Sequence, residues 1–218
     1  YIPQGQHTIN PDYKYRIEAK LPNEEAEMFL TSETNIPLAA ALTTFNKSTS
    51  QSINAGTDKG KTEITLNLQI PSSNSEFYRL NVYRKIFEEK LIDGQLVKIW
   101  NGKTEAMDFI SADKEPLSFH ESLTEPFILI NTNNLENNRF ILKYRSTSSI
   151  ASSDKLDHVY YEFEALTEAT YKYNVSKIKQ LKAEIYGNPE PVINYTNTVN
   201  GYGFLGASNG VTDSLKVD

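Results

Sequence analysis

Two carboxylates on one face of a predicted strand are the leading candidates for chemistry in this chain. Apolar and polar residues alternate over 158–165, which places Glu162 and Glu164 together on the outward face. Glycosidases use two carboxyl groups about 5 to 9.5 Å apart, a separation that this spacing can meet. A glycan hydrolase that uses Glu162 and Glu164 is therefore one hypothesis. Because the outward strands of acidic proteins also carry Glu for solubility, we assign no catalytic residue.

Two glycine motifs match functional fingerprints in their letters but not in their context. Gly201–Gly206 fits the dinucleotide pattern G-x-G-x-x-G, which needs a following helix to hold the pyrophosphate. Only twelve residues follow Gly206, and their pattern predicts no helix. Gly206–Gly210 fits the nucleophile elbow around Ser208, but no His follows His158 to act as its base. We therefore expect neither a nucleotide cofactor nor a serine nucleophile.

The glycines of this C-terminal segment are instead predicted to serve the backbone. Glycine permits a positive φ or a close approach between chain segments. The dipeptide Asn200-Gly201 is a typical turn sequence. The expected structural motif comprises Asn200, Gly201, Gly203 and Gly206.

The composition argues against several other classes of protein. The 218 residues include 22 Lys and Arg against 28 Asp and Glu, a net charge of −6, and no Cys. This charge balance offers no basic stripe for nucleic acid, and the lack of Cys excludes disulfide scaffolds and Cys-based zinc sites. His7, His120 and His158 lack the spacing of metal ligands. No apolar run approaches the roughly 18 residues of a membrane-spanning helix. We expect no cofactor, no metal and no nucleic-acid partner.

Period-two alternation dominates the chain and predicts antiparallel β structure. The turn signal Asp93-Gly94 predicts a hairpin from about Ile86 to Trp100. Phe127–Ile130 and Phe140–Tyr144 are predicted to pair across an Asn-rich loop at 131–138. Further strands are predicted at 13–19 and 26–31, which form a pair, and at 63–70, 78–84 and 158–165.

One helix is predicted at 167–186, near the C-terminus. Apolar residues recur at steps of three and four from Tyr171 to Ile185, and Thr167 is a suitable N-cap. The lysines in its second half favour the helix dipole and form a solvated face, with binding to a membrane surface or a partner as the alternative. These lysines are Lys177, Lys179 and Lys182.

The same patterns divide the chain into three segments. Residues 1–42 hold the first strand pair, either as the end of an Ig-like domain or as part of the main sandwich. Residues 43–61, rich in Ser, Thr, Asn and Gly, are predicted to form a linker or long loop. Residues 62–218 are expected to form the main β-sandwich, which includes the helix at 167–186.

A contact surface is expected on exposed aromatic side chains. Trp100, Tyr83 and Phe87 lie in or beside the predicted hairpin, and the Asn-rich loop at 131–138 is a second candidate. The alternative for the three aromatic residues is packing in the core or within the hairpin.

Three stretches of the sequence resemble a known family. They are Tyr15–Glu18 with Thr31–Pro37, then Glu76–Val82, and finally Asn188–Val192 followed by Tyr195–Ala207. Their order resembles the Bacteroidota lipoproteins grouped as domain-of-unknown-function family 4249, whose members typically end in a similar Asn- and Gly-rich segment. The resemblance covers most of this chain but only the latter part of a full-length member. The lipid-anchor Cys and first Ig-like strands of the family have no counterpart here.

The residue patterns predict a fold, and the resemblance implies a function. The expected fold is mainly β, an antiparallel β-sandwich of Ig-like or fibronectin-like topology with one packed α-helix near the C-terminus. The expected function is that of a non-enzymatic cell-envelope lipoprotein, exported and lipid-anchored at the outer membrane or cell surface. It would be an accessory or ligand- and partner-binding component of a TonB-dependent transport system. An envelope glycan hydrolase and an adhesin or pilus-like subunit are the alternatives.

Overall fold

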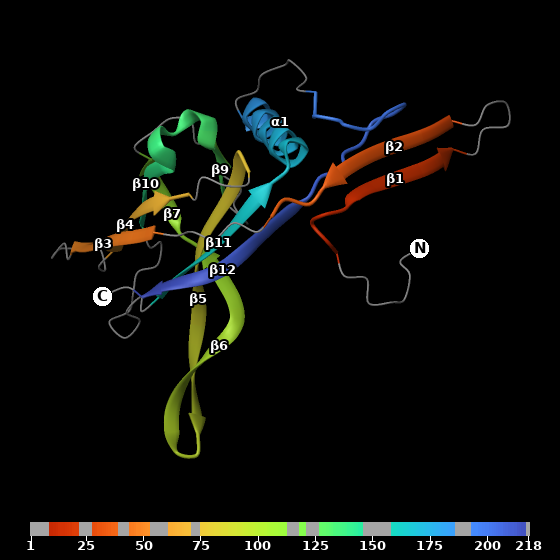
Figure 1. The fold of residues 1–218 in the computed structure, drawn as a ribbon. Helices are drawn as coiled ribbons and strands as arrows, with labels where there is room; N and C mark the ends of the chain where they lie inside the picture. Colours follow the sequence, from red (N-terminus) through yellow and green to blue (C-terminus); the bar gives the residue numbers. More distant parts are fainter. Residues whose placement is uncertain are drawn as a thin grey trace. The chain divides into compact units, whose positions relative to one another are not determined.

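The computed structural model describes most of the chain as two compact units (Figure 1). Unit 1 comprises residues 1–39, 74–77 and 165–209, and unit 2 comprises 40–73, 78–164 and 210–218. Each unit is treated by itself below. The residues described are 9–21, 28–38, 44–52, 61–70, 75–112, 118–120, 127–145, 158–185 and 193–216.

Unit 1 contains a two-stranded antiparallel sheet. Strands β1 (Lys14–Leu21) and β2 (Met28–Asn35) pair along their full length, as the sequence predicted. On β2, Thr31 forms an isolated bridge to Val199, with both N–H···O hydrogen bonds present, at 3.4 and 2.8 Å. Because a lone hairpin is only marginally stable, this bridge to the C-terminal segment supplies support that the pair needs.

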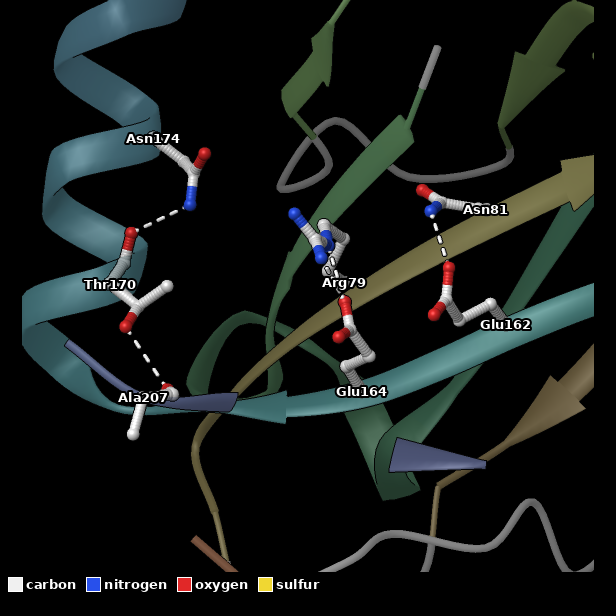
Figure 2. A network of polar contacts seen from close by, with 7 residues as sticks. All are labelled: Arg79, Asn81, Glu162, Glu164, Thr170, Asn174 and Ala207. Atoms are coloured by element: carbon white, nitrogen blue, oxygen red, sulfur yellow. Dashed lines mark hydrogen bonds and ion pairs between the residues drawn. The ribbon is translucent and has the colours of Figure 1, made fainter. Parts of the chain in front are cut away.

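The helix of unit 1 is α1 (Glu168–Ile185), close to the predicted 167–186. The predicted cap is present, since the Thr170 N–H donates to Thr167 Oγ1 at 3.3 Å. The Thr170 hydroxyl in turn donates to the carbonyl of Ala207 at 3.0 Å, and Asn174 Nδ2 donates to the Thr170 carbonyl at 2.8 Å (Figure 2). The first turn of α1 is thus fixed to the segment that precedes the last strand.

Most of the other strands lie in unit 2 and form two antiparallel sheets. The four-stranded sheet has the order β3 (Thr44–Ser52), β4 (Lys61–Gln69), β10 (Arg139–Arg145), β7 (Asp108–Ala112). The six-stranded sheet has the order β12 (Ser208–Lys216), β11 (His158–Leu166), β5 (Phe77–Ile92), β9 (Phe127–Asn131), β8 (Ser118–His120), and β6 (Gln95–Ala106) pairs with β5. The fold class is therefore mainly β, with antiparallel sheets and one helix in the C-terminal half.

The predicted linker at 43–61 is wrong for residues 44–52. These residues form β3, which pairs with β4 from Thr44↔Gln69 to Ser52↔Lys61. Within the described residues β3 pairs with β4 alone and so is an edge strand, a position where polar side chains are common. The remainder of the segment, 53–60, lies outside the described residues.

The predicted pairing of 127–130 with 140–144 is also wrong. Both segments are strands, but β9 belongs to the six-stranded sheet and β10 to the four-stranded one. The 3₁₀ turns η1 (Thr132–Asn134) and η2 (Glu136–Asn138) connect them. Asn137 and Asn138 have positive φ values of 54° and 55°, a conformation that Asn tolerates, so the chain leaves one sheet and enters the other.

Buried aliphatic and aromatic side chains of both sheets form the core of unit 2. In β11 the burial alternates as the sequence predicted, with Val159, Tyr161 and Phe163 buried. In β5, Tyr78, Leu80 and Val82 are buried, and Tyr78 stacks on Phe163 with ring centroids 5.0 Å apart. Other buried side chains of this core include Leu66, Ile128, Leu129, Ile130, Phe140 and Leu142. None of the described helical segments is long and apolar enough to cross a membrane.

Candidate functional site

The outward face of β5 and β11 carries a series of cross-strand side-chain pairs. Arg79 donates from its Nε to Glu164 at 2.5 Å, and its terminal nitrogen also forms an ion pair with the same carboxylate (Figure 2). One step along, Asn81 Nδ2 donates to Glu162 at 3.0 Å. Alternation along the two strands places these groups opposite the buried residues of the core. Arg79 also lies over the ring of Phe127, 5.6 Å from its centroid.

Glu162 and Glu164, the two carboxylates that suggested acid–base chemistry, are both engaged in these pairs. The Glu164 side chain is only 12% exposed and is neutralised by the guanidinium of Arg79. Glu162 accepts the hydrogen bond from Asn81. Both carboxylates are thus engaged in contacts within the sheet, an arrangement that favours a structural role over that of a free general acid. Among the residues that the structure covers, no cluster of acidic and histidine side chains could hold a metal ion.

The same face continues into a group of aromatic rings around a lysine. Tyr83 stacks on Tyr160 with ring centroids 5.9 Å apart and an interplanar angle of 17°. The Lys85 ammonium lies 4.2 Å from the ring centroid of Tyr160 and 4.9 Å from that of Trp100. Phe87 is the direct register partner of Trp100. We call these five residues, Tyr83, Lys85, Phe87, Trp100 and Tyr160, the aromatic–lysine surface.

Burial affects the tyrosine at the inner end of this surface. Burial, and then the negative charge of Glu162, raise the pKa of Tyr83, with a smaller effect from Tyr160. Tyr83 is therefore a neutral hydroxyl-bearing ring throughout the physiological range, which suits stacking and hydrogen bonding rather than proton transfer. The outer end of the surface is more open: Phe87 and Trp100 are 44% and 46% exposed.

A bulge in β6 holds Trp100 in place. The register between β5 and β6 shifts between Lys85 and Phe87, where Gly102 adopts a φ of +84°. The bulge brings the Lys103 carbonyl within 2.8 Å of the indole N–H of Trp100, which donates to it. The ring therefore has a fixed orientation before anything binds.

Beyond the bulge, β5 and β6 form a two-stranded arm, residues 87–100. It extends past the ends of the neighbouring strands of the sheet (Figure 1), and within the described part of the chain β6 pairs with β5 alone. Asp93 and Gly94 close it with positive φ values of 51° and 79°, the conformation of a type I′ turn, which agrees with the predicted hairpin. Six of its large apolar side chains are exposed: Phe87, Leu91, Ile92, Leu96, Val97 and Trp100.

The structure brings the three aromatic residues of the predicted contact surface together. Tyr83, Phe87 and Trp100 lie on one face, whereas the Asn-rich loop 131–138 forms the connection from β9 to β10. Sequence reasoning missed Lys85 and Tyr160. The alternation in the sequence places each of them on the polar face of its own strand. They become neighbours only because β5 pairs with β11, which the alternation does not predict.

The comparisons with known proteins give a family and no closer relative. The family model described as "Domain of unknown function (DUF4249)" matches residues 1–214. The chain belongs to the DUF4249 family. No curated protein and no solved structure matches the chain significantly.

In this DUF4249 chain the Gly-rich segment of unit 1 is held by close approaches. A Cβ atom built on Gly201 would lie 2.3 Å from Leu30 Cδ2, and one on Gly203 would lie 2.8 Å from Thr198 Oγ1. On Gly206 it would lie 2.2 Å from Thr170 Oγ1 and 2.3 Å from the Phe204 ring. The positive φ, at 65°, belongs to Asn200 rather than to these glycines. The segment therefore needs glycine for space.

Asn197 is the polar centre of this segment. Its side chain receives the Leu205 N–H at 2.9 Å, donates to the Leu205 carbonyl at 2.7 Å, and accepts from Ser32 Oγ at 3.0 Å. The dinucleotide motif and the nucleophile elbow both need a helix after their glycines, but the strand β12 begins at Ser208 instead. The polar groups of Asn197 are thus used in contacts within the DUF4249 fold.

The histidines do not form a site in the described part of the chain. His158 is exposed at the start of β11, with its ring 6.4 Å from that of Tyr160. His120 ends β8, and His7 lies outside the described residues.

Proposed function

We propose that this DUF4249 protein is a non-enzymatic cell-envelope lipoprotein that works by binding a partner. In this proposal it is an accessory component of a TonB-dependent outer-membrane transport system, lipid-anchored at the outer membrane or cell surface. The observation that carries the binding role is the aromatic–lysine surface, together with the exposed arm that continues it.

The energetics of exposure support this role. Exposed apolar side chains that gather in one place gain free energy when a partner covers them, at about 25 cal/mol per Å². Trp100 and Phe87 are directly opposite in the register, and so are Leu91 and Leu96 nearer the turn. Directly opposite residues of an antiparallel pair share a face, so these four side chains form one apolar stripe, which the charged pair Glu89 and Lys98 interrupts.

We also propose that the two sheets of unit 2 form a sandwich of Ig-like or fibronectin-like topology. Buried side chains on both sheets, such as Leu142 on β10 and Leu80 on β5, support this arrangement. The connection of β9 to β10, which passes from one sheet to the other, also supports it. A crystal structure of the protein tests the idea through the angle and spacing between the sheets.

The engagement of Glu162 and Glu164 with β5 argues for a structural role of these carboxylates. A glycan hydrolase would need at least one of them released toward substrate. The proposal therefore expects that Glu162→Gln and Glu164→Gln leave partner capture unchanged. Release of reducing sugar from envelope glycans by the natural protein, lost in these variants, would support the hydrolase alternative instead.

The test of the binding role is capture from native outer membranes. The lipidated full-length protein carries an affinity tag, and captured proteins are compared for the natural sequence, Trp100→Ala and Phe87→Ala. Tyr13→Ala is the matched control, because Tyr13 is an exposed aromatic residue of unit 1 (63% exposed). We expect a membrane protein that is captured by the natural and Tyr13→Ala proteins and lost with the other two. Equal capture by all four would overturn the proposed role of this surface.

A further inference from the structure

We propose that the aromatic–lysine surface receives an acidic segment of a partner protein, with a partner carboxylate on the Lys85 ammonium. This inference rests on the proposed function and specifies the chemistry of the partner at the same surface. Adjoining apolar side chains of that segment would lie on Trp100 and Phe87.

Among the described residues, Lys85 differs from the other cations of β5 in forming no ion pair with a carboxylate. Arg79 forms an ion pair with Glu164, Arg84 with Glu105, and Lys90 with Glu88. Within the described ranges, the charged end of Lys85 instead meets the two rings of Tyr160 and Trp100. Cation–π contacts of this kind hold an ammonium in place but leave its positive charge uncompensated.

The charge around Lys85 favours an anion. Along the arm face that carries Trp100, the next register pair is Glu89 with Lys98, whose opposite charges offset each other. The ion pair of Glu88 with Lys90 lies on the other face. Within the described residues the Lys85 ammonium forms no ion pair, and Glu162, the carboxylate two residues from Tyr160 on the same face, accepts a hydrogen bond from Asn81, in a protein whose net charge is −6. Such an ammonium attracts carboxylates, while the rest of the molecule repels them.

The length and character of the stripe favour a polypeptide over an acidic glycan. Beyond the charged pair Glu89 and Lys98, the stripe resumes at Leu91 and Leu96, each 70% exposed. At about 3.4 Å per residue, the step from Phe87 to Leu91 spans roughly 14 Å. Aliphatic side chains of a protein segment can cover such a stripe, whereas a hydrated sugar chain has few apolar groups to place there. The unpaired edge of β6 also offers backbone hydrogen bonds to an extended segment.

Trp100 provides a direct readout, since it is the only tryptophan in the chain. The probes are a random copolymer of Glu and Tyr and its counterpart of Lys and Tyr. They are added to the full-length protein while tryptophan emission is excited selectively. We expect saturable changes in emission with the Glu copolymer, weakened by salt, and none with the Lys copolymer. Lys85→Gln should weaken binding by about tenfold and Lys85→Arg should retain it, as expected for loss of one charge-assisted contact.

Lys103→Gln is the matched control, because Lys103 is an exposed lysine on β6, the strand of Trp100, and its contact with the indole is made by its backbone carbonyl. It should bind the Glu copolymer as the natural protein does. Equal binding of both copolymers, no binding of either, or tighter binding of polygalacturonate or of phosphatidylglycerol vesicles would overturn the inference.

Capture from native outer membranes separates the two proposals. If Trp100→Ala loses the captured protein while Lys85→Gln retains it fully, the contact surface stands and the carboxylate inference fails. If Trp100→Ala retains it, the proposed function of the surface fails as well. If both variants lose the captured protein while their thermal stability is unchanged, the result supports both the proposed function and the carboxylate inference.

Discussion

The two faces of β5 and β11 use the same alternation for opposite purposes. On the buried face, Tyr78 and Phe163 stack 5.0 Å apart, fully removed from water. On the outward face, Tyr83 and Tyr160 stack 5.9 Å apart, and the exposed Trp100 lies beyond them across Lys85. The geometry of the two aromatic pairs is similar, but their surroundings are not.

This difference separates stability from recognition. Aromatic rings on the buried face are surrounded on all sides, so their removal leaves a cavity. Rings on the outward face are held in place by one or two contacts and leave part of their surface for another molecule. A large loss of stability from a variant on the outward face, or a small one from a variant on the buried face, would contradict this difference. Four predictions test it, from the largest expected effect to the smallest.

The largest effect is expected for Phe163→Ala on the buried face. Phe163 is fully buried, and its truncation should lower the free energy of unfolding by about 3–5 kcal/mol. Tyr160→Ala, three residues earlier on the same strand but on the outward face, should cost about 1 kcal/mol, the worth of one aromatic contact. Urea denaturation of the two variants measures both values. Similar losses would show that the outward ring is also part of the core.

Arg79→Met should have the next largest effect. It leaves the Glu164 carboxylate, 12% exposed, without its cation and should cost about 1–3 kcal/mol. The double variant Arg79→Met/Glu164→Leu should recover much of that loss, because no buried charge then lacks a partner. A double-mutant cycle by chemical denaturation gives the coupling. A coupling near zero would mean that the pair is not structural, and would reopen Glu164 as a functional carboxylate.

Much of the fold follows from alternation in the sequence. The buried and outward residues of β11, the turn at Asp93 and the capped helix beginning after Thr167 all depend on local patterns. Local patterns do not determine which strands pair with each other, which is why the pairing predicted for β9 and β10 was wrong. Both strands have suitable apolar residues, but the 3₁₀ turns between them direct them into different sheets. Edge strand β3 was missed because its polar sequence has no apolar period.

The candidate site could be predicted only in part for a similar reason. Trp100 and Phe87 are recognisable as aromatic residues near a hairpin turn, and their opposition in the register follows from that turn. The contribution of Tyr160 requires the contact between β5 and β11, strands that are separated in the sequence by residues 93–157. Lys85 was missed because an ordinary surface lysine becomes notable only when two rings flank it.

Alkaline pH should distinguish the buried tyrosine of β11. Burial, and then the charge of Asp213 and its hydrogen bond at 3.2 Å, raise the pKa of Tyr161 to about 12. Because the unfolded value is near 10, the folded state binds this proton more tightly. The stabilisation is complete below pH of about 10 and is lost as pH rises through about 12.

Tyr161→Phe should therefore flatten the decline of unfolding free energy between those two pH values. Denaturation at a series of alkaline pH values measures the slope, with Tyr202→Phe as the control, because Tyr202 is 93% exposed. Parallel slopes for the natural protein and Tyr161→Phe would contradict the predicted linkage.

The smallest effect on stability is expected for Phe87→Ala on the arm. Phe87 is 44% exposed and lies on the two-stranded part of the hairpin, so its truncation should change the free energy of unfolding by no more than about 0.5 kcal/mol. The same variant should shift the emission of Trp100 to longer wavelength, because the indole loses the apolar neighbour directly opposite in the register. Denaturation and fluorescence of one sample measure both outcomes. An exposed side chain that has no packing partner within the protein adds little to the free energy of folding. A loss of stability close to that of Phe163→Ala would therefore show that Phe87 is packed as a core residue and is not free to bind a partner.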